Sequence, residues 1–239
     1  MSGHSHWAGI KHKKALTDAK RAGIFTKLGR AVTLAAREGG GNQEFNFKLK
    51  LTIDQARFAN MPKDNIERAI KRGTGELKDG AEIEEIIYEA YGPGNVAMLI
   101  KTATDNKNRT LGDLKNILTK TRGKIVSAGS VSFLFKQVGN INITVPEGVD
   151  PYELELKAID AGAEDTIYSE NILTIYTKSE NLQKTKENLE KEGLKIRNAM
   201  IIYAPLQKIT LNQQDKIDYG KMIKALDDQE DIQEVYDNL

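Results

Sequence analysis

The spacing of apolar residues changes once along the chain, and the change falls at a glycine-rich stretch, residues 73–80. Before this stretch apolar residues recur three and four positions apart, which is the period of amphipathic helices. After it, short apolar runs typical of strands alternate with helical segments. A helical region followed by a mixed region predicts an α+β fold, with residues 73–80 as a linker. At 239 residues the chain is long enough for three small domains.

Three helices are predicted before the linker, and together they would form a small bundle over residues 17–73. The first begins near residue 17 and is stopped by the triple glycine 39–41. The next segment, residues 45–60, fits the alternation of a strand as well as the spacing of a helix, and we choose the helix. The third has Pro62 in its first turn, and Gly73 is expected to end it in the left-handed conformation.

Beyond the linker the pattern predicts a hairpin, a helix and a further strand. The apolar runs 83–90 and 95–102 flank the turn-forming sequence YGPG at 91–94, as in a β-hairpin. A helix over 110–120 and a strand over 130–135 follow. These elements are the start of an α/β layer.

The next part of the chain predicts the order β-α-β-β-α-β, which is the ferredoxin-like arrangement. The predicted elements are a strand over 141–145, a helix over 151–161, strands over 166–169 and 172–177, a helix over 180–192 and a strand ending at 203.

A helix over 215–226 and a strand over 231–236 follow Pro205, and these two elements cannot bury a core alone. We expect them to complete the middle domain. The predicted domains are therefore a basic helical domain with an N-terminal arm (1–77), a discontinuous α/β domain (78–136 plus 205–239) and an inserted ferredoxin-like α/β domain (137–204).

Charge is divided unevenly along the chain, although the net charge is only +1. Residues 1–75 hold 15 Lys and Arg against 6 Asp and Glu, a net +9, which leaves −8 for residues 76–239. A basic segment on an acidic remainder attracts a polyanion to one end of the molecule. The alternative is a basic face that is merely solvated.

The N-terminal arm combines cations with aromatic rings. Lys11, Lys13 and Lys14 lie beside Trp7 and His12, so phosphate-binding charges alternate with rings that could stack on a base or ribose. This pattern favours RNA or distorted nucleic acid over a uniform duplex. Alternatively, Trp7 anchors the arm on the helical bundle and the lysines are solvated.

All three histidines of the chain, His4, His6 and His12, lie in the same arm and raise the question of a metal site. No acidic residue precedes Asp18, so the carboxylates that usually orient ligating imidazoles are missing nearby. We predict no metal site and no cofactor.

The polar segment 104–110 precedes a predicted helix and offers Asp105, Asn106 or Asn108 as a cap. Capping does not explain Lys107 and Arg109, because cations at a helix start oppose the macrodipole unless an anion is bound there. A second nucleic-acid contact is the alternative interpretation.

Other function classes find little support in the sequence. No phosphate-binding P-loop, no G-x-S-x-G elbow and no H-E-x-x-H helix occurs, and there is no cysteine, so we predict that the protein is not an enzyme. No apolar run approaches the roughly 18 residues of a membrane span. We expect a cytoplasmic protein without membrane contact and take a monomer as the working state.

Several segments together resemble the YebC/PmpR family. They are GHSHWAGIKHKK at 3–14, NMPKDNIERAIK at 60–71, YGPG at 91–94, TDNKNRT at 104–110 and GSV at 129–131. The resemblance extends along the whole chain. Two positions depart from the family pattern, His6 in place of the usual Lys and Asn95 in place of a commoner Gly.

This resemblance implies three domains, the third inserted in the second, and a regulatory role. The family carries the label of probable transcriptional regulators with DNA binding, whereas mitochondrial relatives are translational activators of cytochrome oxidase and some bacterial ones are tied to stalled ribosomes. We therefore expect a non-enzymatic nucleic-acid-binding regulator, with a ribosome- or RNA-binding translation factor and a protein-interaction adaptor as alternatives. The predicted nucleic-acid-binding residues are Trp7, Lys11, His12, Lys13, Lys14, Lys20, Arg21, Lys27, Arg30, Lys63, Arg68, Lys71, Arg72, Lys107 and Arg109.

Overall fold

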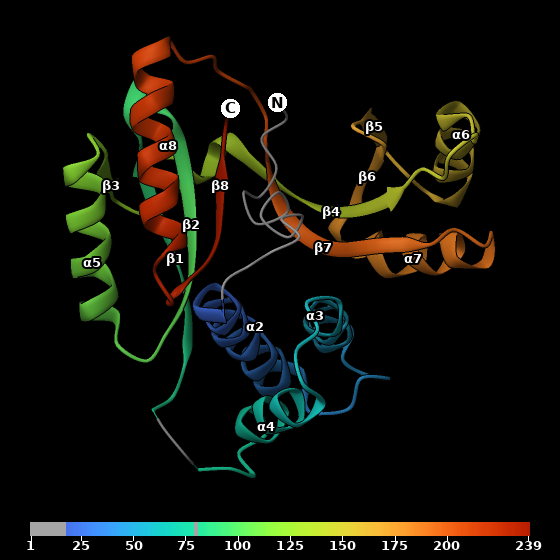
Figure 1. The fold of residues 1–239 in the computed structure, drawn as a ribbon, viewed down its shortest axis with the longest axis horizontal. Helices are drawn as coiled ribbons and strands as arrows, with labels where there is room; N and C mark the ends of the chain where they lie inside the picture. Colours follow the sequence, from blue (N-terminus) through green and yellow to red (C-terminus); the bar gives the residue numbers. More distant parts are fainter. Residues whose placement is uncertain (1–17, 79–80) are drawn as a thin grey trace. The chain divides into compact units, whose positions relative to one another are not determined.

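A computed structural model describes residues 18–78 and 81–239 and shows an α+β fold, as predicted (Figure 1). The chain divides into two compact units. The first holds the described residues up to Phe135 together with Ala204–Leu239, and the second is Lys136–Tyr203. The further separation of the first unit into a helical and a middle domain stays a prediction. No helix among the described residues is long and apolar enough to cross a membrane.

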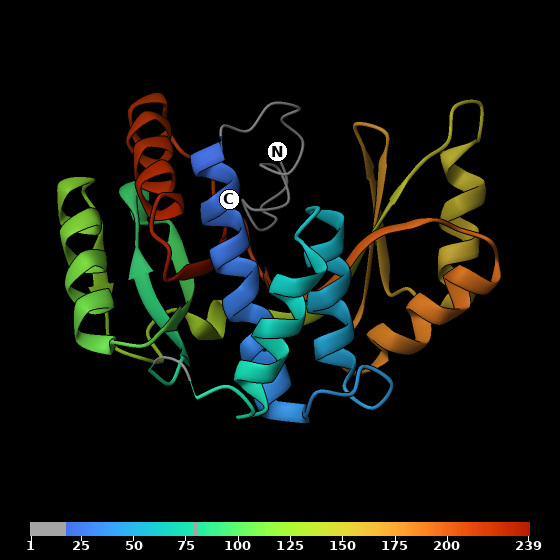
Figure 2. The ribbon, with the colours of Figure 1, turned by 60° about the horizontal axis from the view of Figure 1, so that its bottom comes forward.

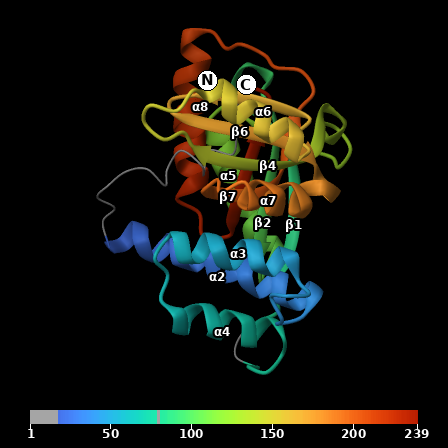
Figure 3. The ribbon, with the colours of Figure 1, turned by 90° about the vertical axis from the view of Figure 1, so that its right-hand side faces the viewer.

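The described part of the first unit begins with three helices: α2 (Asp18–Gly39), α3 (Phe47–Phe58) and α4 (Lys63–Gly73). They lie side by side, with α2 in contact with both of the others (Figures 2 and 3). Their core is made of buried aliphatic residues, among them Val32 of α2 and Leu49 and Ile53 of α3. The ambiguous segment 45–60 contains the helix α3, so the choice of a helix over a strand is confirmed.

Asn46 explains why that segment becomes a helix. Its side-chain oxygen accepts a hydrogen bond from the Leu49 amide at 2.9 Å and so caps α3. Its amide nitrogen donates to the carbonyls of Ala35 and Gly40, at 2.7 and 2.8 Å, and so fixes α3 to the end of α2. A strand would leave this buried amide without these partners.

Gly73 does not have the predicted role. It is the last residue of α4, and the left-handed residue that follows the helix is Gly75, with φ of +80°. A Cβ on Gly73 would lie 2.3 Å from the Thr33 carbonyl oxygen and 2.7 Å from the Ala36 Cβ. The position therefore requires glycine because α4 approaches α2 closely there.

The rest of the first unit contains an antiparallel sheet in the order β3-β1-β2-β8. The strands are β1 (Glu84–Tyr91), β2 (Ala97–Thr104), β3 (Lys124–Val126) and β8 (Ile232–Asp237). The predicted hairpin is present, with β1 and β2 joined through the short 3-10 turn η1 (Pro93–Asn95). The C-terminal strand thus completes the middle sheet.

Both faces of this sheet are covered, since seven of the eight residues of β2 are buried. Helices α5 (Lys107–Lys120) and α8 (Gln213–Asp227) pack with Met98 and Ile100 on one face (Figure 1). On the other face Leu34 of α2 packs with Ile83 and Ala103. Helix α2 is therefore part of the covering of the sheet as well as of the helical bundle.

The predicted strand over 130–135 is wrong. Residues Ser132–Leu134 form the 3-10 turn η2, and the strand β4 (Phe135–Thr144) begins only afterwards. The buried carboxylate of Glu89 accepts hydrogen bonds from the amides of Gly129, Val131 and Ser132, at 2.7, 2.6 and 3.0 Å. Amides that converge on one carboxylate cannot pair with a neighbouring strand, so the local apolar alternation is overridden.

The second unit has the predicted ferredoxin-like order. After β4 come α6 (Pro151–Ala161), β5 (Asp165–Ser169), β6 (Ile172–Lys178), the short turn η3 (Ser179–Asn181), α7 (Leu182–Lys191) and β7 (Ile196–Pro205). The sheet order is β5-β6-β4-β7, with β6 antiparallel to both β4 and β5. The buried side chains of the second unit include Ile141, Ile143, Leu173, Ile175 and Leu182.

Candidate nucleic-acid interface

The predicted contact residues of the N-terminal arm lie outside the described residues. These are Trp7, Lys11, His12, Lys13 and Lys14, and the side chain of Lys20 is also outside the described part. The histidines at positions 4 and 6 lie in the same segment. Within residues 18–78 and 81–239, no group of His, Cys, Asp and Glu is placed to hold a metal ion.

Helix α4 presents a row of cations to solvent. Arg68, Lys71 and Arg72 are exposed and follow the spacing i, i+3, i+4, which places them on one face of the helix. Ile66 and Ala69 lie on the opposite side and are buried against the bundle. No described carboxylate forms an ion pair with Arg68 or Lys71. This face, defined by residues 68, 71 and 72, is called the α4 basic face below.

Two other predicted cations of the helical region are exposed. Lys63 begins α4 and pairs with Glu67 at 3.5 Å, an i,i+4 contact between exposed side chains that leaves the ammonium accessible. Arg21 is exposed on the first turns of α2.

Helix α3 adds an exposed cation that the sequence interpretation missed. Lys50 is exposed, and no ion pair to it forms among the described residues. Arg57, seven positions later and so on the same side of the helix, is exposed with Asp54 at 4.0 Å. The helical spacing predicted for this segment already carries the signal, but the sequence interpretation used only its apolar positions.

Lys27 has a different environment from the other predicted cations. Its side chain is only 5% exposed, and its Nζ donates to the Asp227 carbonyl at 2.7 Å. Burial lowers the pKa of this ammonium below its ordinary value, and the charges of Asp227 and Glu234 raise it back only in part. An ammonium enclosed in this way cannot reach a phosphate, so Lys27 is withdrawn from the proposed contact set.

Arg30, one turn further along α2, also points into the protein. Its guanidinium donates to the Ala103 carbonyl at 3.0 Å and forms an ion pair with Asp231, just before β8. Both side chains are largely buried. Arg30 therefore joins α2 to the sheet and is withdrawn as well.

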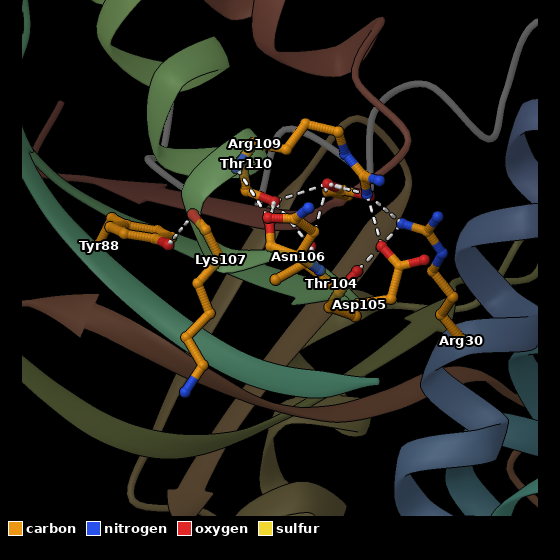
Figure 4. Close-up of polar contacts among 10 residues, drawn as sticks. Arg30, Tyr88, Thr104, Asp105, Asn106, Lys107, Arg109 and Thr110 are labelled. Carbon is orange, nitrogen blue, oxygen red and sulfur yellow. Dashed lines mark hydrogen bonds and ion pairs between the residues drawn. The ribbon is translucent and has the colours of Figure 1, made fainter. Parts of the chain in front are cut away.

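A polar cluster joins the segment 104–110 to α2, and Figure 4 shows its members Arg30, Thr104, Arg109 and Thr110 side by side. Asp231 is the acceptor that these four residues share. Its carboxylate accepts from Arg109 at 3.0 Å, from the Thr110 hydroxyl at 2.6 Å and from the Thr104 hydroxyl at 3.2 Å, besides Arg30. Burial would raise the pKa of Asp231, but hydrogen bonds from Thr110, Arg30 and Arg109 outweigh it and leave the pKa below its ordinary value. These five residues are called the Asp231 cluster.

The two cations at the start of α5 form ion pairs with carboxylates of the protein itself. Asn106 caps the helix by accepting from the Arg109 amide at 3.1 Å. Arg109 pairs with Asp105 at 2.7 Å as well as with Asp231, and Lys107 pairs with Glu84 at 2.7 Å. In Figure 4 the ammonium of Lys107 points away from the cluster. Three carboxylates thus supply the negative charge for which a bound anion was invoked, and the segment needs no second nucleic-acid contact.

Similarity to known proteins extends along the whole chain. Residues 5–76 match the family model described as the TACO1/YebC protein N-terminal domain, and residues 83–239 match that of the TACO1/YebC second and third domain. A probable transcriptional regulatory protein of Persephonella marina is 48% identical over all of this chain and 95% of its own length. One from Thermotoga maritima, with the same description, is 47% identical over all of this chain and 93% of its own length.

A solved structure gives the same result for the fold. The crystal structure of a conserved hypothetical protein from Aquifex aeolicus superimposes with a TM-score of 0.88 at 45% identity, covering 98% of this chain and 96% of the other. The predicted resemblance is thereby confirmed. The chain belongs to the TACO1/YebC family.

Proposed function

We propose that this chain is a cytoplasmic, non-enzymatic regulator of gene expression that binds nucleic acid through phosphate contacts from its helical region. The observation that carries the proposal is the α4 basic face, where Arg68 and Lys71 face solvent without a carboxylate partner among the described residues. Cations left unpaired on one helix face attract a polyanion, whereas those paired with internal carboxylates do not.

The names of the relatives support regulation of transcription, and we take DNA as the first candidate ligand for such a role. Several relatives at 45 to 48% identity are described as probable transcriptional regulatory proteins. Phosphate contacts carry no sequence information, so the α4 basic face by itself suits duplex DNA or structured RNA. RNA or the ribosome is therefore the second candidate ligand, favoured by the lack of a clear base-reading set among the cations of α4.

The test is the salt dependence of binding. The full-length chain is titrated with a fluorescent DNA duplex and with an RNA hairpin that has the same number of phosphates. Each lost phosphate contact makes the plot of log affinity against log salt shallower by about 0.9 for duplex DNA. The variant Arg68→Ala/Lys71→Ala should therefore lower the slope by about 2 and weaken binding about tenfold near physiological salt.

A matched control keeps the charge change but moves it to the second unit. Lys184 and Lys191 of α7 are exposed, and the variant Lys184→Ala/Lys191→Ala should leave slope and affinity unchanged. Equal effects of the two double variants would reduce the binding to net charge and overturn the proposed interface. The better ligand of the two decides between DNA and RNA. A complex with another protein that survives complete nuclease digestion, with no nucleic-acid binding by the pure chain, would instead favour the adaptor.

A further inference from the structure

Helix α6 is apolar on two opposite sides. Leu154, Ala158 and Ala161 are buried against the sheet of the second unit. Tyr152, Leu156 and Ile159 are 63, 46 and 57% exposed. At 100° per residue these three lie within about 60° of each other, centred opposite the buried side. They form a continuous outward row, called the α6 ridge.

The α6 ridge contributes nothing to the core of its own unit. A surface helix normally turns polar residues outward, and single exposed apolar residues are common. Three large apolar side chains in helical register are less common, and contiguous exposed apolar surface marks a site of association with another protein. Other strongly exposed aromatic residues, such as Phe45 and Phe133, are separate from any such row.

The ridge is flanked by carboxylates on both sides. Glu153 and Asp160 lie on one side of the row and Glu155 on the other, from their positions on the helix. No ion pair to these three carboxylates forms among the described residues. Residues 147–165 hold seven acidic residues and a single lysine. The rim is thus strongly negative, and its charge is not balanced locally.

We propose that the α6 ridge is a docking surface for a basic amphipathic helix of a partner protein. The i, i+4, i+7 row spans about 10 Å, which is two turns, and matches an apolar stripe on a second helix packed alongside. The flanking carboxylates select Lys and Arg beside that stripe. A second copy of α6 would bring like charges together, and a nucleic acid would be repelled by the same carboxylates.

The test uses three synthetic 18-residue peptides labelled with fluorescein and the full-length chain. The first has a leucine stripe flanked by lysines, the second the same stripe flanked by glutamates, and the third the composition of the first in scrambled order without a stripe. Fluorescence anisotropy should show binding of the lysine-flanked peptide at least tenfold tighter than that of either other peptide.

Variants of the ridge locate the binding. Leu156→Gln/Ile159→Gln replaces two exposed residues by a good helix former. This change should lower the affinity for the lysine-flanked peptide at least tenfold. Phe45 lies outside this unit and is more exposed than the ridge residues, so Phe45→Ser should leave the affinity for the lysine-flanked peptide unchanged. Glu153→Gln/Glu155→Gln/Asp160→Asn should abolish the preference for lysine over glutamate. Circular dichroism checks that each variant retains its helix content.

Three outcomes would overturn the proposal. Equal binding of the scrambled and striped peptides would reduce the effect to general charge attraction. An unchanged affinity in the ridge variant would place the peptide elsewhere. A free chain that sediments as a dimer and becomes a monomer in the ridge variant would make a second copy the occupant. The nucleic-acid affinity of the ridge variant is measured in parallel and should stay at the wild-type value, so the two proposals fail independently.

Discussion

Cations of the same residue types have opposite roles in helices α2 and α4. On α4, Arg68 and Lys71 face solvent, and no ion pair to them forms among the described residues. On α2, Lys27 and Arg30 point into the protein, where Lys27 donates to Asp227 at the end of α8 and Arg30 to Ala103 and Asp231. A basic sequence therefore does not by itself make a basic surface. The carboxylates and carbonyls that each helix meets in the tertiary structure decide which cations remain for a ligand.

The largest expected effect comes from removing the carboxylate of the Asp231 cluster. Asp231→Ala leaves Arg30 and Arg109 without their shared partner and removes the carboxylate that accepts from the hydroxyls of Thr104 and Thr110. Breaking a largely buried ion pair on one side costs about 3 kcal/mol of unfolding free energy or more. Urea denaturation followed by circular dichroism measures this loss.

Asp160 of α6 provides the matched control for that change. It is exposed, and Asp160→Ala should alter the unfolding free energy by less than about 0.5 kcal/mol. If Asp231→Ala were as mild as this control, the Asp231 cluster would not hold α2 to the sheet, and the contrast between the two helices would disappear.

The next effect concerns the close contact that positions α4 on α2. Gly73→Ala places a Cβ 2.3 Å from the Thr33 carbonyl oxygen, which is backbone and cannot move aside without shifting a helix. We expect a loss of about 2 kcal/mol in unfolding free energy, as for overpacking elsewhere. Gly112→Ala in the middle of α5 meets nothing within 4 Å and should instead stabilise by up to about 1 kcal/mol. A similar effect of both changes would contradict the close approach.

A smaller effect concerns the pH dependence of the unfolding free energy. The pKa of Asp231 is lowered in the folded protein, so the folded state holds the carboxylate ionised more strongly than the unfolded chain does. This contribution is present above the ordinary pKa of an aspartate, about 3.9, and is lost as pH falls through the lowered value. The difference in unfolding free energy between wild type and Asp231→Asn should therefore be constant between about pH 6 and 8 and shrink below about pH 4. If this difference grew on acidification, the pKa of Asp231 would be raised rather than lowered in the folded protein, and the prediction would be wrong.

Much of the fold could be predicted because local patterns agreed with the tertiary structure. The capping residue Asn106 and the glycines of the hairpin at 91–95 act through local backbone geometry, and they were visible in the sequence. The strand predicted over 130–135 failed because Glu89, some forty residues earlier, captures its amides. The roles of Lys27 and Gly73 could not be predicted for the same reason, since their partners lie far away in the sequence or on another helix.

The residues of the candidate site show the same division between features that local sequence predicts and features that distant partners decide. The exposure of Arg68, Lys71 and Arg72 followed from the amphipathic spacing of α4, which a helical pattern reveals. The ion pairs of Arg30, Lys107 and Arg109 rest on Asp231, Glu84 and Asp105. Only Asp105 is close to its partner in sequence. Pairing across a sheet depends on topology, which residue spacing does not encode.

The smallest expected effect tests the contrast most directly. Lys27→Met keeps the length of the buried stem and removes a charge that donates to the Asp227 carbonyl. Because this ammonium cannot reach a phosphate, the affinity for DNA or RNA should change less than about twofold, against about tenfold for Arg68→Ala/Lys71→Ala. Arg21→Met, which removes an exposed cation from the same helix, should fall between the two. The affinities are measured by anisotropy well below the melting temperature of each variant, so that a loss of stability does not reduce the folded fraction. A tenfold loss in Lys27→Met would mean that the inner side of α2 becomes accessible when the ligand binds, and the separation between paired and available cations would no longer hold.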